Sequence, residues 1–428
     1  MVLAILGGVF VVALVAGIPI GVALGIASVL ALVFGTGIPP AGIPQRVLAG
    51  MDSFALLAIP CFILAGSFMN HGGITRRIIA FANVLVGRFT GGLALMNIVA
   101  SLIFAGKSGS SVADTSAVGG VLIPAMIERG YDRDYTVAVT ASSSGIAAVI
   151  PPSITLVVYG VITGTSITSM FLAGIVPGII YGLGLMVVAF VIAKKRSYAR
   201  EAPVSLAVFL KALREVIWAL LTPIIIMAGL IGGIFTVTEA AAVAAVYAFL
   251  VGMFVYRELK LSHLPQILYE NALLVSSIML IISMAELYKW VLVLADAPGT
   301  VANWLFTLTQ DPIVLLLLIN VAMLALGVFM EANAAIVITV PILFPVVVAL
   351  GVDPVHFGVM MVFNLCLGLV TPPVGLCLNL AAKMARLPVA RAVRATVPFF
   401  SIGVVMLLLI TLVPAVTTTL PTFVRGLR

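Results

Sequence analysis

Long apolar segments separated by short polar or charged loops run the whole length of the chain. Residues 171–193, 217–256 and 397–416 are examples, and several such segments reach the roughly 20 residues that a membrane-spanning helix needs. Most end at a Gly, a Pro or a short charged loop. The pattern predicts an all-α polytopic protein embedded in the lipid bilayer, with about ten or more crossings.

The composition excludes a soluble protein, because 63% of the residues are hydrophobic and only 9% are charged. The formal net charge of +7 does not indicate a nucleic-acid partner. Lys and Arg gather in short loops between apolar segments, which is the pattern of loops held at the cytoplasmic face. We therefore expect no nucleic acid among the partners.

The sequence carries none of the motifs that would indicate an enzyme. It has no GxxxxGK[ST] phosphate loop, no HExxH or GxSxG motif, and three cysteines without metal or disulfide spacing. ATP hydrolysis within this chain is therefore excluded, and we expect no enzymatic activity.

An internal repeat appears when the chain is shifted by 221 residues against itself. Five of the nine prolines in the first half then fall on a proline, including the pair Pro151-Pro152, which meets Pro372-Pro373. Equivalent loops carry opposite charge bias, so the halves are predicted to be inverted in the membrane. The predicted divisions are a first repeat at 1–193, a basic cytoplasmic linker at 194–215 and a second repeat at 216–428.

Each half contains a polar stretch between two apolar flanks that are too short to span. In the first half this stretch is 106–116, and its counterpart in the second half is 327–333. Backbone at membrane depth must line a protein-enclosed cavity unless its hydrogen bonds are satisfied internally. We therefore predict two re-entrant hairpins, at about 93–127 and about 314–349.

Each half also contains a polar helix that is broken by a double proline. Ser142, Ser143 and Ser144 lead to the first pair, and Asn364 leads to the second. A double proline removes two amide donors and frees nearby carbonyl oxygens, which together with Ser, Thr and Asn oxygens suit sodium. The N-termini of the half-helices that follow can face an anionic solute. Two ion sites flanking one solute site are predicted.

Ionisable residues at membrane depth are costly and usually functional, which draws attention to Asp114 and Glu331. Their plainer role would be to cap the half-helices of the hairpins. Ser101 and Thr140, taken singly, are interpreted as helix-packing residues. The residues predicted to face the solute are Lys107, Ser111, Asp114, Ser153, Glu331, Asn333 and Asn379.

Several motifs together resemble the large membrane subunit of TRAP transporters, the tripartite ATP-independent periplasmic transporters of the DctM family. These motifs lie at 51–66, 108–114, 122–126, 151–154 and 236–242, and the resemblance covers essentially the whole chain. The chain departs from the family pattern at Ala55, Lys107 and Val237.

The resemblance implies an elevator transporter of the bacterial inner membrane, in which a scaffold carries a mobile unit. It implies sodium-coupled import of a small carboxylated solute, such as an organic acid, a dicarboxylate, or a sialic or sugar acid. It also implies two partners, a small four-helix membrane subunit and a soluble periplasmic binding protein that delivers the solute. The mobile unit would comprise about 93–164 and 314–384.

Two sodium sites follow from the resemblance, residue by residue. The first would use Ser108, Ser110, Ser144, Gly145, Ile150 and Pro152, and the second would use Gly327, Thr371, Val374 and Gly375. The solute would lie between the two hairpin tips. An alternative is a sodium–carboxylate symporter that works alone, and another is the membrane subunit of a sodium-pumping decarboxylase. A passive channel is disfavoured because paired hairpins would occlude it.

Overall fold

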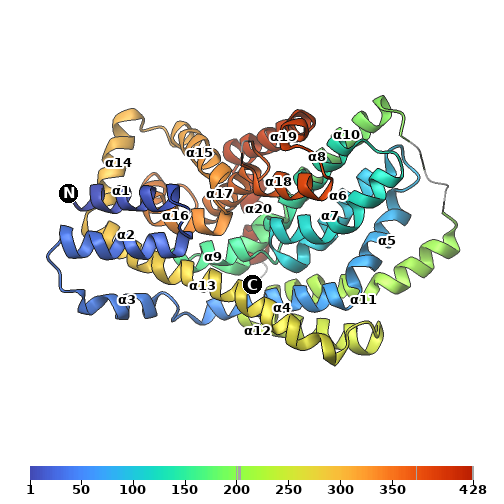
Figure 1. Cartoon of the computed structure of the whole chain (residues 1–428), viewed down its shortest axis with the longest axis horizontal. Helices are drawn as coiled ribbons and strands as arrows, with labels where there is room; N and C mark the ends of the chain where they lie inside the picture. The colour runs from blue at the N-terminus through green and yellow to red at the C-terminus, as the bar shows by residue number, and fades with distance from the viewer. Residues whose placement is uncertain (199, 201–203, 373, 427–428) are drawn as a thin grey trace.

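The computed structural model describes residues 1–198, 200, 204–372 and 374–426, without the side chains of 106–108. Throughout this part of the chain the regular elements are helices (Figure 1), which confirms the all-α prediction. Eight of these helices are long and apolar enough to cross a membrane, and the protein is an inner-membrane protein as expected.

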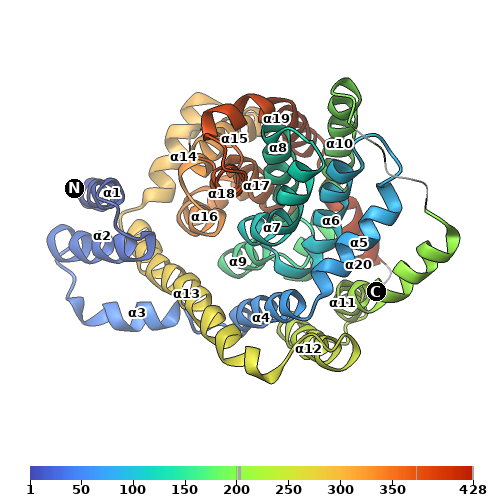
Figure 2. The ribbon, with the colours of Figure 1, turned by 45° about the vertical axis from the view of Figure 1, so that its right-hand side comes forward.

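The helices form an outer layer and an inner cluster (Figure 2). The outer layer consists of α1 (Val2–Val15), α2 (Ile20–Gly35), α3 (Ile43–Ala49), α4 (Ala58–His71), α5 (Ile74–Val86), α11 (Leu206–Ile231), α12 (Val237–Leu250), α13 (Leu264–Leu294) and α14 (Ala297–Leu308), with the short turns η1 (Pro40–Gly42), η2 (Phe54–Leu57), η4 (Val251–Val255) and η5 (Leu261–His263).

The inner cluster holds the two hairpins and the two broken helices. It consists of α6 (Gly92–Ser108), α7 (Ser111–Glu128), α8 (Arg133–Ser144), η3 (Gly145–Ala148), α9 (Ile154–Thr163), α10 (Ile167–Lys195), α15 (Pro312–Phe329), α16 (Ala332–Ala349), α17 (Pro354–Gly368), α18 (Leu376–Met384), α19 (Val389–Leu412) and α20 (Ala415–Gly426).

Helix boundaries recur at the spacing of the sequence repeat. Helix α7 spans Ser111–Glu128 and α16 spans Ala332–Ala349, so both ends are 221 residues apart. The long helix α13 covers the stretch equivalent to α3, η2 and α4 together, which is broken at Gly50–Ser53 in the first half. These boundaries fit a duplication. That the first repeat ends at residue 193 and the second begins at residue 216 remains a prediction. Helix α11 begins at Leu206, so the last part of the expected linker is helical.

The two hairpins enter the molecule from opposite ends of α10. Asp132, at the base of the α6–α7 hairpin, accepts a 2.7 Å hydrogen bond from the hydroxyl of Tyr198, which follows the end of α10. Pro354, at the base of the α15–α16 hairpin, accepts a 2.7 Å hydrogen bond from Tyr159 of α9, which precedes the start of α10. The hairpins are therefore inverted relative to each other.

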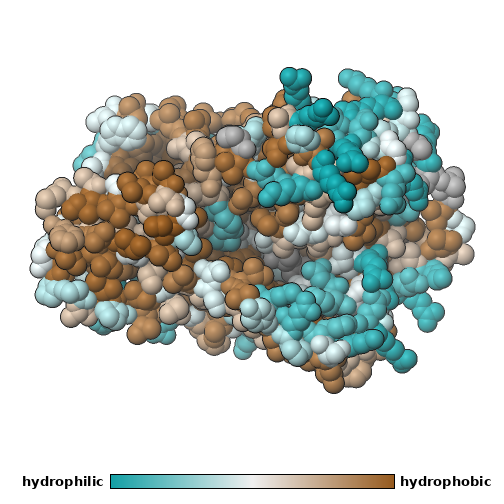
Figure 3. Space-filling view, in the orientation of Figure 1, coloured by the Kyte–Doolittle hydropathy of each residue, from teal (hydrophilic) through white to brown (hydrophobic). Residues whose placement is uncertain are grey.

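Each hairpin packs against the helix that follows the break in the other half. Helix α7 packs on α18 as well as on α8, while α16 packs on α9. This exchange places residues from both repeats around one centre. Hydrophilic side chains gather where α10 ends and α11 begins, at the right of Figure 3, and the side of α1 and α2 is mostly hydrophobic.

Candidate functional site

The tip of the first hairpin lies directly on the break between η3 and α9. Gly109 turns the chain between α6 and α7 with a φ of +57°, and a Cβ added there would be 2.7 Å from the carbonyl oxygen of Pro152 and 2.6 Å from the amide nitrogen of Ile154. Ser110 then caps α7 by accepting a 3.4 Å hydrogen bond from the amide of Ala113. The structure thus brings Gly109, the neighbour of the predicted residue Ser110, against the predicted residue Pro152.

The break itself is buried and held by side chains. Ser153 donates a 2.5 Å hydrogen bond to the carbonyl of Ala148 and accepts one of 3.2 Å from the amide of Leu156, so it caps α9. Ser144 donates to the carbonyl of Ala141 at 2.7 Å. Gly145 follows as the first residue of η3, and half-buried Ile150 lies within the break.

A buried polar network joins the first hairpin to α8. Ser101 donates a 2.8 Å hydrogen bond to Asp114 Oδ2 and contacts Ser143 Oγ at 3.3 Å. Asn97 accepts from Ser143 at 3.1 Å and donates to Thr140 at 2.7 Å. Asp114 therefore faces the interior of the cluster, between α6 and α8. Our interpretation of Ser101 and Thr140 as packing residues missed their polar partners.

The tip of the second hairpin is capped by its acidic residue. Glu331 accepts hydrogen bonds from the amides of Asn333 and Ala334, at 2.9 and 3.3 Å, and Asn333 Nδ2 donates to its other oxygen at 2.8 Å. A carboxylate at a helix N-terminus is favoured by the helix dipole. This contact corresponds to the plainer of the two roles expected for Glu331.

The second break repeats the close approach seen in the first half. A Cβ on Gly368, at the end of α17, would be 2.7 Å from Gly327 Cα in the first arm of the hairpin. Thr371 donates to the carbonyl of Leu367 at 2.8 Å. A Cβ on Gly375 would lie 2.8 Å from the carbonyl oxygen of Thr371.

The remaining predicted residues divide between described and undescribed positions. Asn379 of α18 donates from its side-chain amide to the carbonyl of Val374, which fixes that carbonyl beside the break. Lys107 and Ser108 end α6, but their side chains lie outside the described part of the chain, as does Pro373.

Buried oxygens without a hydrogen-bond partner surround this centre. Within the described part of the chain they include Ser142 Oγ, Asn333 Oδ1 and Asn364 Oδ1. Asn333 belongs to the first turn of α16, and the other two belong to the broken helices α8 and α17. Because unsatisfied buried oxygens are costly, the set fits a place where a ligand completes them.

Two cysteines connect the halves at the same centre. The Cys366 thiol lies beside Ser111, and the Cys377 thiol lies beside Thr115 and Ser144. Both helices that carry these cysteines belong to the second repeat, whereas their neighbours belong to the first. The predicted residues of the first repeat therefore lie against helices α17 and α18 of the second repeat, so both repeats contribute side chains to this centre.

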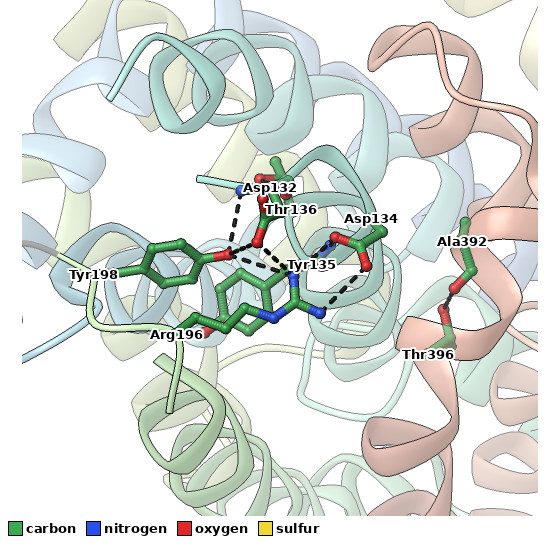
Figure 4. A network of polar contacts seen from close by, with 8 residues as sticks. All are labelled: Asp132, Asp134, Tyr135, Thr136, Arg196, Tyr198, Ala392 and Thr396. Atoms are coloured by element: carbon green, nitrogen blue, oxygen red, sulfur yellow. Dashed lines mark hydrogen bonds and ion pairs between the residues drawn. The ribbon is translucent and has the colours of Figure 1, made fainter. Parts of the chain in front are cut away.

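An ionic network that sequence reasoning missed joins the start of α8 to the end of α10 (Figure 4). Arg196 binds Asp132 at 2.8 Å and Asp134 at 2.9 Å. The ring of Tyr198 also stacks on that of Tyr131, with centroids 4.3 Å apart. Burial raises the pKa of the Tyr198 phenol, whose hydroxyl donates to Asp132. These contacts hold α8 and the end of α10 together at the base of the first hairpin.

Comparison with known proteins identifies the family of the chain. The family model described as "Tripartite ATP-independent periplasmic transporter, DctM component" matches residues 7–416. A C4-dicarboxylate TRAP transporter large permease protein, DctM, of Pseudomonas aeruginosa is 42% identical over 370 residues, covering 86% of this chain and 87% of that protein.

Two further relatives are named after other solutes. The sialic acid TRAP transporter large permease protein SiaM of Vibrio cholerae is 40% identical over 415 residues, covering 96% of this chain and 97% of that protein. The isethionate TRAP transporter permease protein DctMQ of Oleidesulfovibrio alaskensis is 41% identical over 425 residues; the match covers 99% of this chain but 66% of that protein.

A solved structure supports the fold alone. The YdaH transporter of Alcanivorax borkumensis, described as having an unusual topology, matches with a TM-score of 0.62 at 15% identity. The match covers 89% of this chain and 87% of that one. The helical architecture is therefore shared with a transporter of very different sequence.

Proposed function

Because this chain belongs to the DctM component family of tripartite ATP-independent periplasmic transporters, we propose that it is the membrane permease of a sodium-coupled importer for a small organic acid. One observation carries the proposal. In each half, glycine brings an arm or tip of a hairpin against the backbone of a broken helix, as at Gly109 with Pro152 and at Gly327 with Gly368. Such interrupted helices are where secondary transporters hold coupling ions and solutes.

The sodium proposal rests on the oxygens around each break. In the first half, Ser110 and Ser144 present hydroxyl oxygens beside the freed carbonyls of the double-proline break. In the second half, the hydroxyl of Thr371 and the carbonyls next to Gly375 offer the same kind of ligand. Hard oxygen donors of this type suit sodium, so the residues present fit the ion that we propose. A bound sodium would supply positive charge next to the solute.

The solute proposal rests on helix N-termini. Helices α7, α9 and α18 begin at a hairpin tip or a break, and their positive ends favour an anion, whereas the corresponding end of α16 is capped by the Glu331 carboxylate. Candidate contacts are Lys107, Ser111, Asp114, Ser153, Glu331, Asn333 and Asn379. The named solutes of the relatives include a dicarboxylate, a carboxylated sugar and a sulfonate, so their common feature is an acid group on a small polar molecule. A carboxylate remains our proposal for this chain.

Transport would follow an elevator movement of the inner cluster against the outer layer. The proposal is supported by the arrangement of the helices in two groups and by the way each hairpin packs on the other half of the cluster. The family name adds two expected partners, a small four-helix membrane subunit and a soluble periplasmic binding protein that hands over the solute.

Reconstitution into liposomes tests the proposal. The chain would be incorporated with the small subunit, supplied with succinate, N-acetylneuraminate or isethionate and the corresponding binding protein, and assayed with and without an inward sodium gradient. Accumulation that requires both sodium and the binding protein is the expected result. Uptake without the binding protein would instead indicate a symporter that works alone, and uptake without sodium would overturn the ion sites.

A further inference from the structure

A recess of about 510 Å³ opens where α5, the start of α11 and the end of α12 meet. It lies away from the hairpins, in the outer layer. Its walls carry three cationic side chains, Arg77, Lys211 and Arg214, and two aromatic ones, Trp218 and Tyr256. Cations and aromatics that converge in this way at a membrane-protein surface suit a phosphate group attached to an apolar tail.

The charges around the recess do not cancel. Arg77 binds Glu258 at 2.7 Å, and its guanidinium carbon lies 3.9 Å from the centre of the Tyr256 ring. Among the ion pairs of the described residues, none involves Lys211 or Arg214. Both are exposed on the first turns of α11, one turn apart, where their side chains can reach the same anion.

An apolar surface continues from the cationic part of the recess along α11. Leu210 is 54% exposed, Ile217 is 38% exposed and Trp218 is 43% exposed, on a helix apolar enough to span the bilayer. Tryptophan prefers the level of the lipid headgroups, and Lys or Arg at a helix end reaches toward them. The start of α11 follows the basic linker, whose charge places it at the cytoplasmic face.

We propose that this recess binds the headgroup of an anionic phospholipid of the cytoplasmic leaflet. Lys211 and Arg214 contact the phosphate from α11, Arg77 and Tyr256 form the opposite wall, and the acyl chains run along Ile217 and Trp218. Glu215 also lines the recess, and its carboxylate disfavours a headgroup with several negative charges. Phosphatidylglycerol, with one negative charge, fits these groups.

Trp218 makes the proposal directly measurable. The chain has three tryptophans, so the substitutions Trp290→Phe and Trp304→Phe leave Trp218 as the only one. This double variant would be reconstituted in vesicles of phosphatidylcholine and phosphatidylglycerol in which only one lipid carries brominated, fluorescence-quenching acyl chains. At equal mole fraction, brominated phosphatidylglycerol should be preferred at Trp218 by roughly tenfold, since each cation near the surface favours an anionic lipid.

Paired variants separate a headgroup site from general surface charge. Lys211→Gln with Arg214→Gln should remove the preference. Lys383→Gln with Arg391→Gln, which loses the same charge on α18 and α19, should retain it. Lys211→Arg with Arg214→Lys keeps both charges and should also retain it, which guards against misfolding of the first pair. Equal quenching by the two lipids, or a preference that survives the first pair, would overturn the proposal. If added inorganic phosphate abolishes the preference, the recess binds a free phosphate anion rather than a lipid headgroup.

Discussion

Gly109 and Pro152 are in such close contact that a Cβ on Gly109 would lie 2.7 Å from the Pro152 carbonyl oxygen. Gly109 also has a φ of +57°, a conformation that side chains other than glycine's rarely adopt. Two independent restrictions therefore demand glycine at the tip of the first hairpin. The contact joins the hairpin to the break that supplies the proposed ion ligands.

Replacing Gly109 by alanine should abolish solute uptake, because the tip can no longer rest on the break. Helix α7 offers a matched control in Gly120, where a Cβ would meet nothing within 4 Å. Gly120→Ala should transport at the wild-type rate. Both variants would be quantified in the membrane fraction before uptake is measured in proteoliposomes. Wild-type uptake by Gly109→Ala would show that this contact is dispensable.

Sodium dependence should change when a proposed ligand oxygen is removed. Ser110→Ala and Thr371→Ala should each raise the sodium concentration for half-maximal uptake, and Ser110→Ala should also cost about 1 kcal/mol of stability as a lost cap. Ser116→Ala is the control, since this exposed residue of α7 only bonds to the carbonyl of Val112. An unchanged sodium requirement in correctly inserted Ser110→Ala and Thr371→Ala would contradict the assignment of the two sites.

The hydrogen bond from Ser101 predicts how Asp114 responds to substitution. Asp114→Asn retains an oxygen that accepts from Ser101, whereas Asp114→Leu leaves the buried hydroxyl without this acceptor. The leucine variant should therefore lose about 1–3 kcal/mol of stability and the asparagine variant clearly less. Thermal unfolding in detergent measures both. If the two variants are equally unstable, the charge of Asp114 matters more than its hydrogen bond.

The hairpin boundaries were accessible from sequence. Residues 93–127 were expected and α6 and α7 span Gly92–Glu128, while 314–349 was expected and α15 and α16 span Pro312–Ala349. A polar stretch between short apolar flanks indicates such a hairpin in the sequence itself, and the internal repeat shows the same pattern a second time. Local signals were therefore sufficient for this part of the fold.

The partners of polar side chains inside the helices were not accessible in this way. Ser143 finds Asn97 across 46 positions and Arg196 finds Asp134 across 62, so each pairing depends on how whole helices pack. For Glu331, sequence left two roles open, and only the structure shows its carboxylate bound to the first amides of α16. Which face of a helix meets which neighbour is a tertiary property that spacing alone does not encode.

The base of the first hairpin should loosen when Arg196 is removed. Arg196→Ala takes away ion pairs with Asp132 and Asp134, exposed contacts that are worth about 0.2–1 kcal/mol each. Amide hydrogen exchange at the start of α8 should therefore become faster. Arg394→Ala, which replaces an exposed arginine of α19 away from these ion pairs, is the control. Unchanged exchange in Arg196→Ala would mean that the Tyr198 hydrogen bond and the aromatic stacking suffice to hold the base.

A cross-link between the helix groups tests whether they move. Ala285 of α13 and Val337 of α16 line one cavity of about 210 Å³ between the outer layer and the inner cluster. In a background where Cys61, Cys366 and Cys377 are replaced by serine or alanine, cysteines at 285 and 337 would be bridged by a short reducible dithiol reagent. Uptake should stop after bridging and return after reduction, because the inner cluster would be tied to the outer layer. Each single cysteine variant, treated alike, should transport throughout. Full uptake with the bridge intact, as shown by mass spectrometry, would exclude sliding of α16 along α13 as the transport step.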